Sequence, residues 1–261
     1  MTIYWIYDIP VWAFWLLTVG TTCAVGVGGM VATRGWVGRF HRQHSHNEVV
    51  SYFLTEVGVL YGIMLGLIAV GTWQNYTDTE SKVTMEAASL TALYRDVSNY
   101  PEPARTSLQN GLREYTRYVI NQAWPLQRKG VIPSADSGLL TTFFGELARF
   151  EPATEGQRDL HQEALNEFNR LSELRRLRIL TVSTGLPKTL WVLILVGACI
   201  NLAVTWFFEF QRLAVHFWMS FLMSLLLGLM IHLLADMDNP YRGSYSVSAE
   251  AFQVDYDQLM K

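Results

Sequence analysis

The sequence has few charged residues and few cysteines. Only 16% of its 261 residues are Asp, Glu, Lys or Arg, whereas an average soluble domain has roughly 25%. The net charge of -3 argues against a nucleic-acid partner, because contact with a phosphate backbone needs a basic face. The two cysteines, Cys23 and Cys199, both lie in apolar runs. A disulfide framework is therefore not expected.

Motifs for catalysis and for metal binding are missing as well. The sequence contains no GxSxG, no HExxH, no CxxC and no phosphate-binding loop, which are signatures of common hydrolases, metalloproteases, redox proteins and nucleotide enzymes. The histidines of one short stretch, His41, His44 and His46, are interpreted as a solvated loop. The DMDN stretch fails the EF-hand pattern at once. We therefore predict no enzyme activity, no metal site and no cofactor.

The sequence does contain four apolar runs that are long enough to cross a bilayer, which takes about 20 residues. They cover residues 11–32, 50–73, 189–208 and 213–235. Aromatic residues make up 13% of the chain, which is typical of proteins with membrane–water interfaces. No Lys or Arg precedes the first run, and the run is too long for the apolar core of a signal peptide. We therefore predict that it is a retained anchor.

The region between the second and third runs is mostly polar and predicts helices. Residues 76–99 contain neither Gly nor Pro and continue the second run, so one helix is expected to extend from the membrane into water. Its apolar residues recur at alternating spacings of four and three, the heptad pattern of a seam between helices. The seam consists of Val83, Ala87, Leu90, Tyr94 and Val97. Its partner helix would come either from the same subunit or from another copy.

Further helices are predicted at residues 104–124, 137–150 and 155–184, with prolines and glycines between them. Ser248 is predicted to cap a short amphipathic helix in the tail. The expected fold is thus an all-α integral membrane protein with four transmembrane helices and a helical soluble domain between the second and the third. The expected parts are membrane helices 1 and 2 (1–74), the soluble domain (75–187), membrane helices 3 and 4 (188–236), and a tail that packs on the soluble domain (237–261).

Basic residues suggest an orientation, because short loops rich in Lys and Arg tend to stay in the cytoplasm. The first connection holds Arg34, Arg39 and Arg42, and the N-terminus holds no basic residue. We therefore predict a multi-pass membrane protein with its soluble domain outside the cytoplasm. The opposite orientation is favoured by basic residues ahead of the third run, namely Arg170, Arg175, Arg176, Arg178 and Lys188.

The second run, EVGVLYGIMLGLIAVGTW from Glu56 onward, combines a carboxylate with a row of glycines. Gly58, Gly62 and Gly66 form a doubled GxxxG, which favours close helix packing in lipid. They lie roughly 200°, 240° and 280° around the helix from Glu56. The side headed by Glu56 predicts a pore, with an acidic ring at one mouth and a hydrophobic constriction behind it. Its further members are Leu60, Ile63, Leu67, Val70 and Gln74.

An alternative interpretation places Glu56 at the headgroup level, hydrogen-bonded to a neighbouring helix. The fourth run offers two further patterns. Small residues at a spacing of four, Ser220, Ser224 and Gly228, predict a packing ridge. Near its end, His232, Asp236 and Asp238 predict an acidic vestibule. The alternatives are that His232 and Asp236, one turn apart, form a pair that titrates near neutral pH or a hydrogen-bonded pair at the membrane interface.

Several segments resemble a known family. They are HNEVVSYFLTEVGVLYGIMLGLIAVGTWQNY, then EAASLTALYRDV and NQAWP, and finally NPYRGSYSVSAEAF in the tail. Over about residues 46–252 the chain is similar to the bacterial bestrophin-like proteins. The resemblance implies four membrane helices with a helical domain between the second and third. It also implies a likeness to bestrophins, which are oligomeric channels with a pore lined by the second helix and a cytosolic interhelical domain.

The sequence thus favours a homo-oligomeric ion channel lined by the second membrane helix. Its expected partners are the lipid bilayer, copies of itself and a permeant ion, with no nucleic acid. The acidic mouths favour cations, and the bestrophin likeness favours anions. Two other classes stay open, a non-conducting signalling or scaffold protein and a proton-coupled membrane unit.

Overall fold

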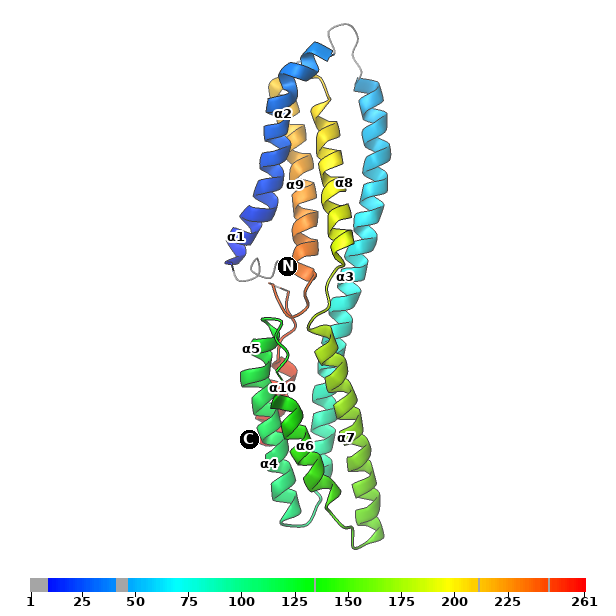
Figure 1. Cartoon of the computed structure of the whole chain (residues 1–261), viewed down its shortest axis with the longest axis vertical. Coiled ribbons are helices and arrows are strands. Elements are labelled where there is room, and N and C mark those ends of the chain that lie inside the picture. Colours follow the sequence, from blue (N-terminus) through cyan, green and yellow to red (C-terminus); the bar gives the residue numbers. More distant parts are fainter. Residues whose placement is uncertain (1–8, 41–46, 134, 211, 244) are drawn as a thin grey trace. The chain divides into compact units, whose positions relative to one another are not determined.

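The computed structural model describes residues 9–40, 47–133, 135–210, 212–243 and 245–261, and within these ranges it is helical without strands (Figure 1). The three histidines of the first connection lie outside the described residues. The chain divides into two compact units. One unit comprises Met1–Gln74 and Gly185–Asp238, and the other comprises Asn75–Thr184 and Asn239–Lys261. We call them the membrane unit and the helical unit.

The membrane unit contains the four predicted spans. They appear as helices long and apolar enough to cross a bilayer, at Val11–Arg39, Asn47–Val97, Lys188–Trp206 and Leu213–Met237. The first span is built from α1 (Val11–Trp15), the π-helical turn η2 (Leu16–Gly20) and α2 (Thr21–Phe40). The others are the first part of α3 (Asn47–Val97), then α8 (Lys188–Trp206) and α9 (Leu213–Met237). The predicted fold class and the four membrane helices are confirmed.

Small residues bring the helices of the membrane unit together. A methyl group at Gly228 on α9 would lie 3.0 Å from the Cα of Val19. One at Gly26 on α2 would lie 1.8 Å from the Ser224 Oγ. In lipid there is no hydrophobic drive between helices, so close approach at such positions is a main source of packing energy.

The helical unit has a conventional apolar core. It contains the second part of α3, then α4 (Ala104–Tyr118), η3 (Val119–Ala123), α5 (Trp124–Gln127), α6 (Ala135–Ala148), α7 (Glu155–Thr181), α10 (Glu250–Asp255) and η4 (Tyr256–Met260). All five residues of the heptad seam on α3 are buried in this core. Their partners come from the same chain, chiefly from α4, α6, α7 and α10. The intramolecular alternative for the seam is therefore the correct one.

Several boundaries in the helical unit differ from the prediction: α6 covers residues 135–148 instead of 137–150, α7 ends at Thr181 instead of residue 184, and the N-cap of α10 is Ala249 instead of Ser248. The helix expected to end at residue 124 continues through η3 and α5 to Gln127, because Pro125 stands in the first turn of α5, where a proline has no intrahelical hydrogen bond to lose. In the tail, the Ser248 Oγ accepts a hydrogen bond of 3.3 Å from the Glu250 N–H at the start of α10. Phe252 and Met260 of this tail are part of the core.

Candidate functional site: the open face of α3

One face of α3 packs within the membrane unit. Tyr61 and Leu65 are buried there against Ile194 and Ala198 of α8. The Tyr61 hydroxyl donates a hydrogen bond of 2.7 Å to the Ile194 carbonyl. Tyr61, Leu65 and the buried Thr72 lie roughly 140–180° around the helix from Glu56. The packed face therefore points away from the row headed by Glu56.

The opposite face of α3 is open along the whole row. Leu60, Ile63, Leu67 and Val70 are 65%, 58%, 70% and 55% exposed. Glu56 and Gln74, which begin and end the row, are exposed as well. The structure thus places all six predicted pore residues on one face, and the described part of the chain covers none of them. In a membrane this face would meet lipid, another copy of the chain or a lumen.

The three glycines lie between the packed face and the open face of α3, with Gly58 nearest the packed face and Gly66 nearest the open face. A methyl group at Gly62 or Gly66 would meet no described atom within 4 Å. One at Gly58 would lie 3.7 Å from the side-chain oxygen of Asn201 on α8. The packing expected of the doubled GxxxG is therefore not made by Gly62 and Gly66 within the described chain. A close approach at these two positions would need a second copy.

The small-residue ridge of α9 lies against the first membrane span. Ser220, Ser224 and Gly228 are buried, and the Ser224 Oγ donates a hydrogen bond of 2.6 Å to the Ser220 carbonyl. Gly228 approaches Val19 of η2 and Ser224 approaches Gly26 of α2. The ridge is thus placed where two helices approach closely, within the same chain.

The polar residues at the end of α9 lie among neighbouring side chains. The His232 ring centroid is 4.8 Å from that of Phe14 and 4.0 Å from that of Trp15, and its Nδ1 is hydrogen-bonded to the Thr18 hydroxyl at 2.9 Å. Asp236 is buried. Neither side chain opens onto an accessible vestibule of the single chain.

Asp238, just beyond α9, stands at the start of α8. Its carboxylate accepts hydrogen bonds from the Leu186 N–H and from the Trp191 Nε1. Burial raises the pKa of this carboxyl group, and the two hydrogen bonds act in the opposite direction. An acid that accepts a hydrogen bond from a backbone N–H ahead of a helix stabilises the start of that helix.

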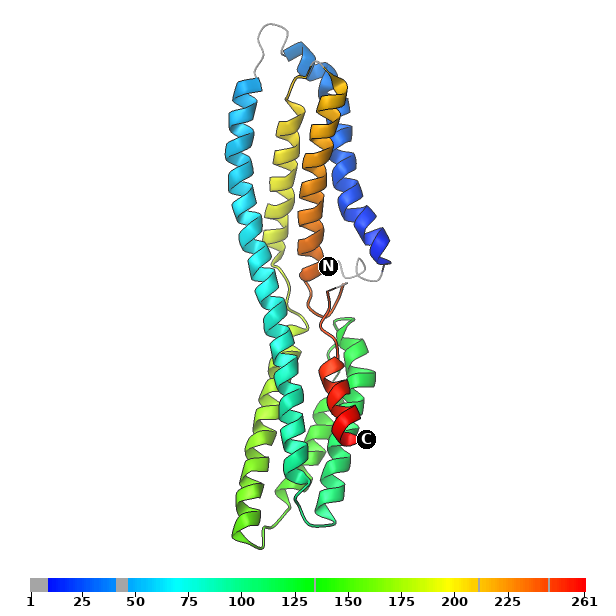
Figure 2. The ribbon, with the colours of Figure 1, turned by 180° about the vertical axis from the view of Figure 1, so that it is seen from behind.

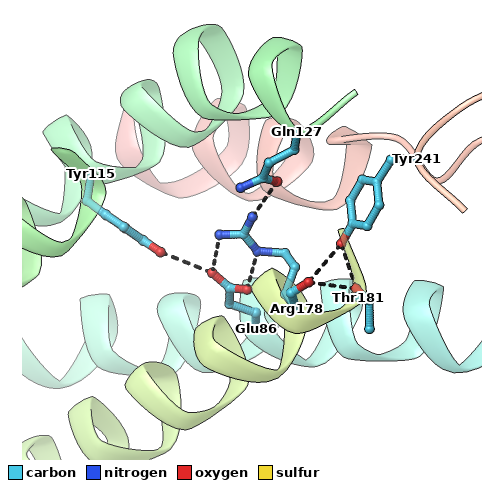
Figure 3. A network of polar contacts seen from close by, with 6 residues as sticks. All are labelled: Glu86, Tyr115, Gln127, Arg178, Thr181 and Tyr241. Carbon is cyan, nitrogen blue, oxygen red and sulfur yellow. Dashed lines mark hydrogen bonds and ion pairs between the residues drawn. The ribbon is translucent and has the colours of Figure 1, made fainter. Parts of the chain in front are cut away.

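The helical unit contains a buried polar network that was not predicted from the sequence (Figure 3). Arg178 of α7 and Glu86 of α3 are fully buried and form an ion pair of 2.5 Å. The Arg178 guanidinium also donates to the Gln127 side-chain oxygen at 2.6 Å, and the Tyr115 hydroxyl donates to Glu86 at 3.0 Å. Burial alone would lower the pKa of Arg178, but the Glu86 carboxylate together with Tyr115 and Tyr241 outweighs it, and the net pKa is raised.

Aromatic rings complete the surroundings of this ion pair. The guanidinium carbon of Arg178 lies 5.7 Å from the Trp124 ring and 5.9 Å from the Phe252 ring. The sequence contains a helical pattern that predicts the burial of Arg178. Arg178 shares the apolar side of α7 with Leu171 and Leu174, at spacings of four and three. The network joins α3, α4, α5, α7 and the tail, and its burial fits a structural role.

The comparisons with known proteins agree with this architecture. A family model described as Bestrophin-like domain matches residues 10–252, and no curated protein has a significant sequence match. A bacterial bestrophin homologue from Klebsiella pneumoniae with an isoleucine-to-threonine mutation superposes with a TM-score of 0.67 at 11% identity, over 95% of this chain and 99% of that chain. A tryptophan-to-alanine variant gives 0.64 at 12% identity, over 97% of both chains.

A crystal structure described as a membrane protein, with a leucine-to-alanine substitution, has a TM-score of 0.68 at 12% identity and covers 94% of this chain and 95% of that one. At such low identity these likenesses show the fold alone. The family model, in contrast, spans nearly the whole sequence. This protein therefore belongs to the Bestrophin-like domain family.

Proposed function

We propose that this protein is a homo-oligomeric ion channel whose pore is lined by the open face of α3. The observation that carries the proposal is the row of four exposed aliphatic side chains headed by a carboxylate, on a helix whose other face is packed. Copies arranged around an axis would turn this row into rings. The structural relatives described as bestrophin homologues support the same reading, since bestrophins are channels.

The rings would act in two ways. Leu60, Ile63 and Leu67 would form a hydrophobic constriction that opens and closes by wetting and dewetting. The carboxylates of Glu56 would form an acidic ring at one mouth, which attracts cations and repels anions. Gly62 and Gly66 flank this face without a Cβ, and they would let neighbouring copies of α3 approach closely.

The constriction is tested by ion flux from liposomes that contain the purified oligomer. Replacing Ile63 by Ser puts a hydroxyl into the apolar ring and is expected to raise the flux about tenfold or more, because a wetted constriction no longer excludes ions. Leu195→Ser is the matched control. Leu195 is half exposed on α8, one residue after Ile194, and it lies outside the row. Its flux should equal that of the unmodified protein.

The outcomes separate this proposal from the other two classes. An intact oligomer that passes no ion, and that gains no leak from Ile63→Ser, would contradict a channel and favour a non-conducting scaffold. Flux that follows a pH gradient and is lost in Glu56→Gln would indicate proton coupling. For a channel, Glu56→Gln is expected to preserve the flux and to shift the reversal potential towards anion permeation.

A further inference from the structure

The helical unit has a groove with no occupant among the described residues. It has a volume of about 480 Å³ and lies between α3 and α10. Its α3 side is formed by small side chains, and the acidic residues Glu250 and Asp255 stand on its α10 side. Thr84, Ala88, Thr91 and Arg95 line it at spacings of four, three and four, which is the pattern of a seam for a facing helix.

This second seam is distinct from the one buried in the core. It lies roughly 110° around α3 from the first seam. The Thr91 hydroxyl is enclosed at the groove and has no hydrogen-bond partner in the described part of the chain. An enclosed polar group without a hydrogen-bond partner is uncommon in a native structure. A binding partner that enters the groove would supply the missing hydrogen bond.

The outer face of α7 has the complementary properties. It exposes Leu177 and Leu180 together with Arg170, Glu173 and Arg176, so two of its three exposed charged residues between positions 170 and 180 are basic. In the helical unit α3 lies between α7 and α10 (Figure 2), and the Ser89 hydroxyl of α3 donates to the Glu167 carbonyl of α7. The groove and the outer face of α7 therefore point to different sides of the unit.

Charged residues of opposite sign on the two surfaces also lie at similar positions along the axis of α3. Helix α7 runs antiparallel to α3, since Glu86 pairs with Arg178 and the later Ser89 contacts the earlier Glu167. Glu163 accordingly lies near the C-terminal end of α3, where it interacts electrostatically with Asp96. The next residue towards the N-terminus of α3 is Arg95, at the same end of the groove.

A second copy displaced sideways without a change in height would therefore bring opposite charges together. Its Glu163 would approach Arg95, and its Arg170 and Arg176 would approach the acidic side of the groove. None of Arg95, Arg170 and Arg176 takes part in a salt bridge with another residue that the structure describes. Complementary charge of this kind fixes the register of an interface.

We propose that the α3–α10 groove binds the outer face of α7 from a second copy of this chain. The two surfaces are different, so the contact is heterologous and repeats from copy to copy until a ring closes. The inference rests on the homo-oligomer of the proposed function but not on ion conduction. It places the part of α3 that belongs to the helical unit beside the contact.

Disulfide cross-linking tests the contact in the full-length oligomer. In a background with Cys23→Ala and Cys199→Ala, Ala88→Cys in the groove is combined with Asn166→Cys or Asn169→Cys on α7. Oxidation is expected to give a ladder of products beyond the dimer on a non-reducing gel, because every copy carries both halves of the contact. Each single-cysteine variant should remain monomeric on the gel. Dimers from Ala88→Cys alone would show a symmetric contact and overturn the proposal.

Charge reversal provides a second readout. Arg176→Glu and Glu250→Arg are each expected to raise the apparent dissociation constant of the oligomer about tenfold or more, and the double variant should recover at least part of the loss. The control is Arg128→Glu, an exposed arginine outside both surfaces. An intact oligomer with neither cross-links nor a charge effect would refute this interface. A full ladder without ion flux would instead refute the channel and retain the ring.

Discussion

The membrane unit and the helical unit use different kinds of residues to pack their helices. In the membrane unit the buried cluster is small, with eight members, and the helices approach most closely at Gly26, Gly29 and Gly197. In the helical unit a larger core holds rings such as Tyr115, Phe143 and Phe252. The fully buried ion pair of Arg178 and Glu86 belongs to the helical unit as well.

The solvent accounts for the difference. Water drives large apolar side chains of the helical unit inward, whereas lipid accepts them on the outside and leaves packing and hydrogen bonds to hold the helices. Exposure of an apolar residue therefore has opposite meanings in the two units. For Leu60 or Leu67 of α3 it is compatible with lipid or a gated lumen, while for Leu177 and Leu180 of α7 it indicates a surface that another protein covers.

The largest effect is expected at the buried ion pair. Arg178→Met leaves the Glu86 carboxylate buried without its cation and should lower the stability of the helical unit by about 3–5 kcal/mol. The exposed Arg158→Met on the same helix is the control and should change stability by less than about 0.5 kcal/mol. Urea unfolding, followed by hydrogen exchange of the amides in α4 and α7, measures both. Equal midpoints for the two variants would mean that the charges are not buried as described.

The next effect is expected at a glycine of the membrane unit. Gly228→Leu drives a side chain into the backbone at Val19 and should destabilise the protein by about 1–3 kcal/mol. At Gly28 of α2 a methyl group would meet no described atom within 4 Å, so Gly28→Leu is the matched control. The melting temperature in detergent is the measurement. If both variants melt alike, close packing at small residues does not hold this unit together.

The smallest effect is a pH dependence of the helical unit. Burial lowers the pKa of His161 below its ordinary value, and its Nδ1 is hydrogen-bonded to the Tyr100 hydroxyl at 2.8 Å. The unfolded chain then binds more protons between the lowered pKa and about 6.5, so stability is complete above this window and falls as the pH drops through it.

Urea midpoints measured at about pH 8 and about pH 5.5 test the sign of this effect. The unmodified protein should lose more stability on acidification than His161→Gln, whose side chain does not titrate. A larger loss in His161→Gln would reverse the sign and refute the assignment.

The membrane spans could be predicted well from the sequence because lipid permits few backbone structures. A run of about 20 apolar residues can satisfy its backbone in lipid only as a helix or in a closed barrel. The absence of Gly and Pro after residue 75 likewise predicted that α3 continues into the helical unit. The doubled GxxxG was less informative. The pattern indicates that a close approach between helices is favourable. The positions of the neighbouring helices decide that Gly58 lies near α8, whereas Gly62 and Gly66 contact no other helix of the described chain.

The ion pair was missed because its members are 92 positions apart in the chain. Local patterns locate Glu86 beside the seam and Arg178 on the apolar side of α7, but the pairing depends on how two distant helices are brought together. The end of α9 was left between three interpretations for a related reason. Phe14, Trp15 and Thr18, which enclose His232, come from the opposite end of the sequence.

The buried pair also constrains how this sequence can change over time. Losing either charge alone removes several kcal/mol, a large part of the stability of an ordinary domain. Replacing both by apolar residues of similar volume can be neutral. A single substitution at position 86 or 178 is therefore selected against, whereas a simultaneous substitution of both can be tolerated. We expect the two positions to change together in evolution. They should also restrict which residues are tolerated at positions 115 and 127, whose side chains are hydrogen-bonded to the pair.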